Sequence, residues 1–192
     1  MKTALIEKFG TPGGNMTVGG ITSPALFHAW NKQIIRGIVW ELMRKLAKEG
    51  WAVLPDIDAG MEDEKNFVRV NALAAAGMID SLCKNAGAEV YFHHHIFDVI
   101  KDNGNGDNTI KAVLTTSRDG LTAFRAKLFI DCTGSGDVAQ LSGFEFDMGA
   151  PESGELQAGS YSFFLNGIDY EKISNNEVNA KFADALNKKD LK

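Results

Sequence analysis

The sequence has 192 residues and a mass of 20.9 kDa, and its hydrophobic content of 44% is enough for one domain with an apolar core. Its 20 Lys and Arg against 25 Asp and Glu give a net charge of −5, with no long block of one sign, which argues against a nucleic-acid partner. Because no apolar run approaches the roughly 18 residues that span a bilayer, and the first one is cut off at Glu7 and Lys8, we expect no membrane segment and no signal peptide at this start.

The first quarter of the chain is predicted to form a strand, a loop and a helix. Residues 1–7 are a short apolar run that ends in the carboxylate Glu7, which is typical of a β-strand. Residues 8–24 hold five glycines and two prolines, too many for a helix, so we expect a loop whose backbone can come close to another group. Apolar residues recur every four positions from Trp30 to Glu49 and predict an amphipathic helix.

The middle of the chain is predicted to contain a helix and four strands. The apolar pattern from Phe67 to Leu82 indicates a second helix, which Gly87 ends. The expected strands are residues 88–92, 96–100, 110–116 and 121–130. Because glycine-containing turns at 103–106 and 118–120 separate the last three, these strands suggest a small antiparallel meander.

The last strand of the meander, 121–130, is expected to pass through a glycine turn into a short helix at 138–141. A further strand is expected at 161–165, and a polar surface helix at 174–188.

Glu7 is the first candidate for a binding role. A strand that ends in an acid and leads into a glycine loop is how dinucleotide-binding folds hold an adenosine ribose, because the carboxylate accepts hydrogen bonds from both ribose hydroxyls. Many strands end in a solvated glutamate, so the surrounding motifs have to decide between these two interpretations.

Several spaced motifs accompany Glu7 in a fixed order. They are Leu5-Ile6-Glu7-Lys8, Gly13-Gly14-Asn15-Met16-Thr17, Asp131-Cys132-Thr133-Gly134-Ser135-Gly136-Asp137 with Gly143, and the segment from Ser162 to Asp169. With these motifs the chain resembles the FAD-dependent oxidoreductase family of the two-dinucleotide-binding superfamily, from residue 2 to about residue 170. The resemblance implies an α/β fold, an incomplete FAD-binding Rossmann-like sheet with an inserted helical region and a β-meander.

The resemblance also implies a cofactor, a reaction and a set of contacts. FAD would carry out hydride transfer from a small organic substrate, and no residue of this chain is identified as catalytic. The cofactor-binding residues carried over from the family motifs are Glu7, Lys8, Gly13, Gly14, Asn15, Thr17, Phe97, Thr133, Gly134 and Asp137. Lys8 would flank the adenine, and the backbone near Phe97 would pair with the adenine edge while its side chain lies in the core. For Asp137, contact with the flavin ribityl or pyrophosphate through water and a helix N-cap are equally good interpretations.

The histidine and cysteine residues, which bind metals or react in other proteins, are expected to have neither role here. His93, His94 and His95 are expected to alternate on a strand, which sends His94 to the opposite face and leaves too few ligands for a zinc site. Cys132 stands where the family usually has Ala and is interpreted as a small residue beside a close turn. With Cys83 far away in sequence, neither a disulfide framework nor a redox pair is expected.

The family's strongest motif, a first strand followed by G-x-G-x-x-G, is absent from the sequence. In the family sheet this strand lies between the strands of residues 2–7 and 122–131. We therefore expect the sequence to be an internal piece of a longer flavoprotein, inactive by itself and weak in FAD retention. Residues 1–150 would be a partial FAD-binding domain, and residues 151–192 the start of a substrate domain.

Two alternatives remain at this point. The chain is either a piece of an oxidoreductase or a non-catalytic binding module, completed by a partner strand from a second copy or another chain. NAD in place of FAD is disfavoured, because the resemblance ties the glycine loop and the meander to flavoproteins. The expected location is cytoplasmic, with an export signal ahead of the missing first strand as the other possibility.

Overall fold

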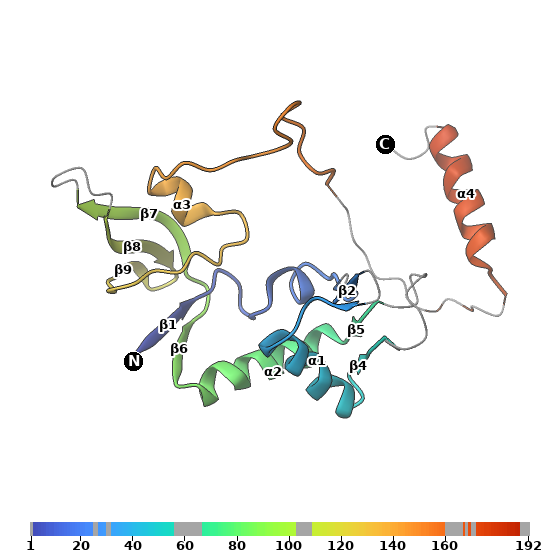
Figure 1. Ribbon diagram of the computed structural model, residues 1–192, viewed down its shortest axis with the longest axis horizontal. Helices are drawn as coiled ribbons and strands as arrows, with labels where there is room; N and C mark the ends of the chain where they lie inside the picture. Colours follow the sequence, from blue (N-terminus) through green and yellow to red (C-terminus); the bar gives the residue numbers. More distant parts are fainter. Residues whose placement is uncertain are drawn as a thin grey trace. The chain divides into compact units, whose positions relative to one another are not determined.

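A computed structural model describes residues 2–24, 27–29, 32–55, 67–102, 109–159, 167, 169 and 172–188 (Figure 1). The chain divides into two units, Met1–Ser160 and Tyr161–Lys192. The first unit holds four small sheets and three α-helices among its described residues, so its class is mixed α/β, as the sequence predicts.

Strand β1 (Thr3–Ile6) lies parallel to β6 (Ala88–Tyr91). The pairing continues past the strand ends, since the Glu7 N–H donates to the Tyr91 carbonyl at 2.9 Å and the His94 N–H donates to the Glu7 carbonyl at 3.0 Å. Glu7 is thereby fixed at the carboxyl end of the pair, and the predicted strand is confirmed. Among the described residues, β1 has a ladder partner on one side only.

The segment after β1 is a loop with one 3-10 turn, η1 (Gly14–Met16), followed by a hairpin of β2 (His28–Ala29) and β3 (Lys32–Gln33). The helix predicted from Trp30 begins only at α1 (Ile38–Lys48). The reason is Gly37, whose φ of 68° and ψ of −144° lie far from helical values and stop the helix at its N-cap. Of the apolar positions before Gly37, Ile34 follows β3 directly and Trp30 lies outside the described residues.

The second predicted helix also begins later than its apolar pattern. Strands β4 (Ala52–Val53) and β5 (Arg69–Val70) pair antiparallel, and α2 (Ala72–Asn85) follows. The Asn71 side chain accepts a hydrogen bond from the Ala74 N–H at 3.0 Å and so caps the helix. The predicted end is confirmed, because Gly87 adopts a φ of 73° just beyond the helix.

One hydrophobic core joins these elements, and we call it the α1–α2 core. Its buried members are Phe27, Leu42, Met43, Leu46, Val68, Val70 and Ala75. Met16 of η1 and Trp40 of α1 pack against it. The glycine-rich segment and the amphipathic helices are therefore parts of one packed region.

The predicted meander is confirmed as the antiparallel sheet of β7 (His95–Asp102), β8 (Thr109–Ser117) and β9 (Gly120–Phe124). The turn predicted at 118–120 joins β8 to β9, whereas the one at 103–106 lies outside the described residues.

The last predicted strand, 121–130, is only half right, because β9 ends at Phe124. Leu128 and Ile130 are 71% and 78% exposed while Phe129 packs on a small core of Val99 and Val113, so the alternation of a strand persists. Residues 125–132 have no ladder partner in the described chain, and a strand needs one.

Helix α3 (Asp137–Leu141) confirms the predicted short helix and packs beside β7. Val138 completes the small core, and the Lys101 ammonium of β7 donates to the Ser142 carbonyl at 2.8 Å. This contact ties the end of the helix to the meander.

The second unit contains α4 (Asn175–Asn187), the predicted surface helix, which begins with a capping box between Ser174 and Glu177. The strand predicted at 161–165 falls outside the described residues. No helix in the described part of the chain is long and apolar enough to cross a membrane.

Candidate functional site

Glu7 presents a carboxylate at the end of β1. Its Oε1 accepts a hydrogen bond from the Phe9 N–H at 2.8 Å, and no donor within the described residues bonds to Oε2. Lys8 is exposed, with its ammonium 5.2 Å from the centre of the Phe9 ring, a cation–π contact. The strand end therefore offers one unused carboxylate oxygen beside an exposed cation.

The glycine-rich segment contains two glycines with different surroundings. Gly13 has a φ of 110°, and a Cβ there would lie 2.6 Å from the Thr17 methyl and 3.2 Å from Ile79 of α2, so both conformation and packing demand glycine. Gly14 has a φ of 52°, and a Cβ there would meet no atom within 4 Å. Gly13 shapes the turn, whereas Gly14 is where another molecule can approach the backbone closely.

The other two predicted residues of this segment hold its shape. The Thr17 hydroxyl donates to the Pro12 carbonyl at 2.8 Å. The Asn15 carbonyl accepts from the Ile21 N–H at 2.9 Å, and its exposed side chain makes no hydrogen bond within the described residues.

A hydrogen-bonded turn leads into α3, and Asp131 is its centre. Its Oδ1 accepts from the Thr133 N–H at 2.9 Å and from the Thr133 hydroxyl at 2.8 Å, and its Oδ2 accepts from the Ala139 N–H at 3.0 Å. The Thr133 hydroxyl oxygen in turn accepts from the Asp137 N–H at 2.8 Å. Two side chains thus satisfy two of the N–H groups that the start of α3 leaves open, those of Asp137 and Ala139.

These hydrogen bonds also set the acidity of Asp131. Desolvation by itself raises the pKa of this carboxyl, but the hydrogen bonds from Thr133 and from the α3 backbone outweigh it and hold the pKa below 3.8. The motif predicted from the sequence contains Asp131 without a role for its side chain. Its position two residues before a threonine and six before a helix start could have indicated that it caps the helix.

The interpretation of Asp137 as a helix N-cap is wrong. Gly136 occupies the N-cap of α3 with a φ of 71°, and Asp137 is the first helical residue. The Asp137 carboxylate makes no hydrogen bond within the described part of the chain. Gly134, with a φ of 84°, has no atom within 4 Å of a built Cβ, so this turn too is open on one side.

Phe97 lies at an irregularity of β7. Ile96 is opposite Thr115 and Asp98 is opposite Leu114, so Phe97 has no partner on β8 and forms a bulge. Its side chain is 42% exposed, and the prediction that it lies in the core is wrong. The extra residue breaks the alternation from which that prediction came, and it leaves the Phe97 backbone outside the β7–β8 ladder.

The histidine triplet does not alternate along a strand as predicted. His93 has a φ of 57° in the turn between β6 and β7, with its ring against Gly10. His94 makes edge contacts with Tyr91 and Phe124, at ring-centre distances of 5.7 Å each. Among the described residues no three metal-ligating side chains come together.

The structure thus brings the candidate residues into three local groups, with Phe97 in the bulge of β7 as a further position. Gly13 contacts Thr17, Thr133 is bonded to Asp137, and Glu7 and Lys8 directly follow β1. No hydrogen bond or ion pair in the described residues joins one group to another.

These features define the class as an α/β protein with glycine turns at the ends of its strands. The chain belongs to the FAD dependent oxidoreductase family, whose model matches residues 1–191. The resemblance stated from the motifs is confirmed, and FAD is the cofactor of this family.

One solved structure similar to this chain is THI4 of Thermovibrio ammonificans, with a TM-score of 0.45 and 20% sequence identity. The similarity covers 73% of this chain and 51% of that one, so this chain spans about half the length of the solved protein. No curated protein matches the chain.

Proposed function

We propose that the chain forms the adenosine side of an FAD site in an oxidoreductase. The observation that carries this proposal is Glu7, a carboxylate at the carboxyl end of a parallel strand with one oxygen unused. Such an oxygen suits the hydroxyls of a ribose. Membership of the FAD-dependent family supplies the identity of the cofactor.

The other candidate residues receive roles consistent with their surroundings. The open sides of Gly14 and Gly134 allow a cofactor to lie against the backbone, while Gly13, Asn15 and Thr17 hold the first turn in shape. Thr133 fixes the second turn, and the Asp137 carboxylate, without a hydrogen bond among the described residues, is suited to contact the flavin ribityl or pyrophosphate through water. Lys8 and the backbone of Phe97, which has no register partner on β8, are assigned to the adenine.

Bound FAD supplies the capacity to accept a hydride from an organic substrate. The chain's own residues bind and orient the cofactor in this proposal, and none of them is assigned to the chemical step. The substrate class is a small organic molecule.

The domain assignment and the incomplete site belong to the same proposal. Residues 1–150 form a partial FAD-binding domain, residues 151–192 begin a substrate domain, and a further strand belongs against the open side of β1. The sequence has no G-x-G-x-x-G turn to hold a pyrophosphate, so we expect residues 1–192 alone to retain FAD weakly.

The cofactor assignment is tested by releasing small molecules from the protein as its source cell makes it. Heat denaturation followed by chromatography should yield FAD in near-equal amount with protein. Failure to find FAD, and failure to load it afterwards, would overturn the assignment.

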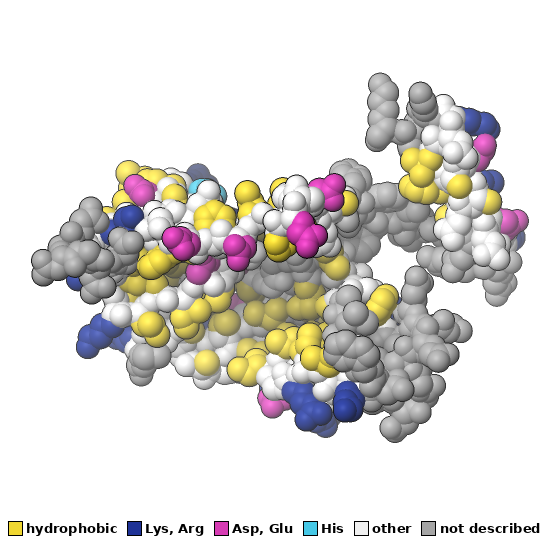
Figure 2. Space-filling model, turned by 45° about the horizontal axis from the view of Figure 1, so that its top comes forward, with side chains coloured by type: hydrophobic (Ala, Val, Ile, Leu, Met, Phe, Trp, Pro, Cys, Tyr) yellow, Lys and Arg dark blue, Asp and Glu magenta, His cyan; other side chains and the backbone are white. Residues whose placement is uncertain are grey.

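A second candidate function is a binding module that accepts a strand from another chain. The observation that favours it is again the open side of β1, because unpaired strand edges pair readily with other strands. Exposed hydrophobic side chains on one face of the first unit are visible in Figure 2. Size-exclusion chromatography separates the two: a strand-completed dimer survives dilution, whereas the oxidoreductase proposal needs no second copy.

A further inference from the structure

His28 is a buried polar group that the proposed site does not use. It is 1% exposed on β2, and its ring lies edge-on to the Trp40 ring, with centres 5.5 Å apart. Neither ring nitrogen has a hydrogen-bond partner in the described part of the chain. Most buried polar groups in proteins are paired, so an orphaned buried imidazole needs a physical explanation.

The surroundings of His28 tolerate a neutral ring and oppose a charged one. Protonation would add a positive charge and a second N–H donor where the described chain offers no acceptor. Burial accordingly lowers the pKa of the His28 ring below 6.5.

The described charged side chains on the neighbouring elements do not offset the cost of a protonated His28 ring. Those on or beside β3, α1 and β5 among the described residues are Lys32, Arg36, Glu41, Arg44, Lys45, Lys48, Glu49 and Arg69. All of them are exposed, six of the eight are cations, and none makes an ion pair with His28.

The region around His28 is connected to the glycine-rich segment. The neighbouring residue Phe27 belongs to the α1–α2 core, against which Met16 of the Gly13–Thr17 turn packs. The Val70 N–H, from the same core, donates to the Thr22 carbonyl at 2.8 Å. Loosening of this core would therefore release the segment that carries Gly13 and Gly14.

We propose that His28 is a pH-sensitive lock on the glycine-rich segment: the neutral ring allows the α1–α2 core to close, and protonation opens it. The lock is a property of the fold, and its effect on cofactor affinity rests on the function proposed above. Because the folded pKa is lowered, protons bind the unfolded chain first. Stability contributed by His28 is therefore complete above 6.5 and falls as the pH drops below that value.

The test compares urea unfolding of the full chain at pH 7.5 and 5.5. We expect the unfolding constant of the wild-type protein to rise on acidification, by at most about tenfold per pH unit for the one proton. His28→Gln should remove most of this rise, while His95→Gln, at an exposed position of β7, should keep it. A rise of wild-type size in His28→Gln would overturn the proposal.

A second measurement decides the question if His28→Gln does not fold. In the unmodified chain, an NMR titration of the histidine rings is followed together with the Trp40 indole. We expect His28 to take up its proton only as the Trp40 signal leaves its native position. Protonation of His28 with an unchanged Trp40 environment would contradict the lock.

FAD titration separates the lock from the proposed function. We expect FAD to bind more weakly at pH 5.5 than at pH 7.5, and we expect His28→Gln to abolish this pH dependence. That result supports both the lock and the cofactor proposal. No FAD binding at either pH in the protein as the source cell makes it overturns the cofactor proposal alone, because the urea and NMR results still decide the lock.

Discussion

The polar atoms of His28 and Asp131 have opposite surroundings. His28 is enclosed by the α1–α2 core with no hydrogen bond among described residues, whereas Asp131 is exposed and accepts three hydrogen bonds at the start of α3. The first region is stabilised by apolar burial, and the buried His28 ring without a hydrogen bond lowers its stability. The second has a small apolar core and is held largely by directed hydrogen bonds.

The two regions should therefore lose stability through different kinds of substitution. Volume lost from the α1–α2 core should matter most in the first, and acceptors lost from the α3 turn should matter most in the second. Their responses to acid should also occur in separate pH ranges.

The largest expected effect is on the α1–α2 core. Leu46 is fully buried, so Leu46→Ala should lower the free energy of unfolding by about 2–5 kcal/mol through lost burial and a cavity. Leu121→Ala, on the exposed part of β9, should change it by less than about 0.5 kcal/mol. Urea denaturation measures both, and equal losses would contradict the assignment of this core.

Removal of the Asp131 carboxylate should have the next largest effect. Asp131→Ala leaves N–H groups of Thr133 and α3 without their acceptor and should cost about 0.5–2 kcal/mol, the range for lost helix caps. Asp137→Ala removes a carboxylate from the same helix without a described hydrogen bond, so it should cost less. If Asp137→Ala proved the more damaging change to stability, the description of this turn would be wrong.

The acid response of Asp131 follows from its lowered pKa. Stabilisation by this carboxylate is complete above 3.8 and is lost as the pH falls through the still lower pKa of the folded state. The stability difference between wild type and Asp131→Asn should therefore shrink only below about pH 4. Unfolding curves from pH 6 to 2.5 measure this difference. If this stability difference declined around pH 6 instead, a group other than Asp131 would have to be its cause.

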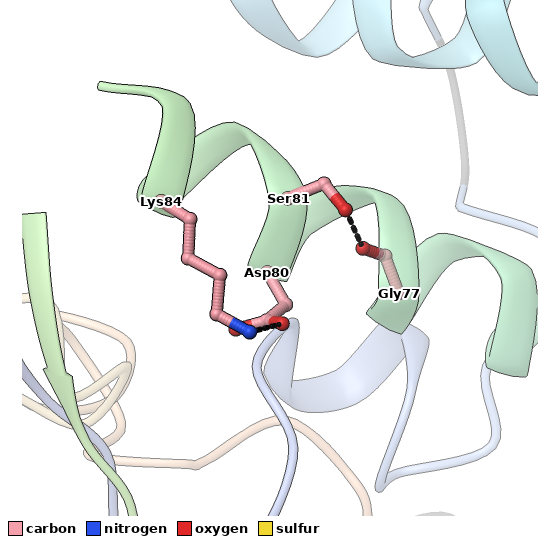
Figure 3. A network of polar contacts seen from close by, with 4 residues as sticks. All are labelled: Gly77, Asp80, Ser81 and Lys84. Carbon is pink, nitrogen blue, oxygen red and sulfur yellow. Dashed lines mark hydrogen bonds and ion pairs between the residues drawn. The ribbon is translucent and has the colours of Figure 1, made fainter. Parts of the chain in front are cut away.

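The smallest expected effect concerns the polar network on α2 (Figure 3). The Lys84 ammonium lies 2.7 Å from Asp80 Oδ2, four residues earlier on the helix, and it is largely exposed. Lys84→Met should cost no more than about 0.5 kcal/mol, because exposed pairs at this spacing contribute little. Thermal unfolding in low and high salt checks it, and a loss above about 1 kcal/mol would show that the pair is less exposed than described.

The sequence predicted those parts of the fold that depend on local pattern. Strand β1, the meander and α3 follow from apolar runs broken by glycine turns. The start of α1 was missed because four-residue spacing continued through a hairpin, and only the backbone angles of Gly37 show where the helix begins. The end of β9 was missed because alternation does not reveal whether a neighbouring strand exists.

For the candidate site, motif order predicted the family and the cofactor but gave less about individual side chains. The bulge at Phe97 and the capping by Asp131 in place of Asp137 depend on pairing and hydrogen bonds formed between separate segments. His28 has no sequence signal of its own, because burial without a partner is a property of the folded core.

The most direct test of the proposed site is the FAD affinity of Glu7→Gln beside that of Glu89→Gln, in the protein as its source cell makes it. Glu7 directly follows β1, whereas Glu89 is an exposed carboxylate on the adjacent strand β6 that accepts a hydrogen bond from the Tyr91 hydroxyl. We expect Glu7→Gln to weaken FAD binding by about 10- to 100-fold, the effect of a lost hydrogen bond to a charged group, and Glu89→Gln to leave it unchanged. Unchanged affinity in Glu7→Gln would contradict the central claim that this strand-end carboxylate holds the cofactor.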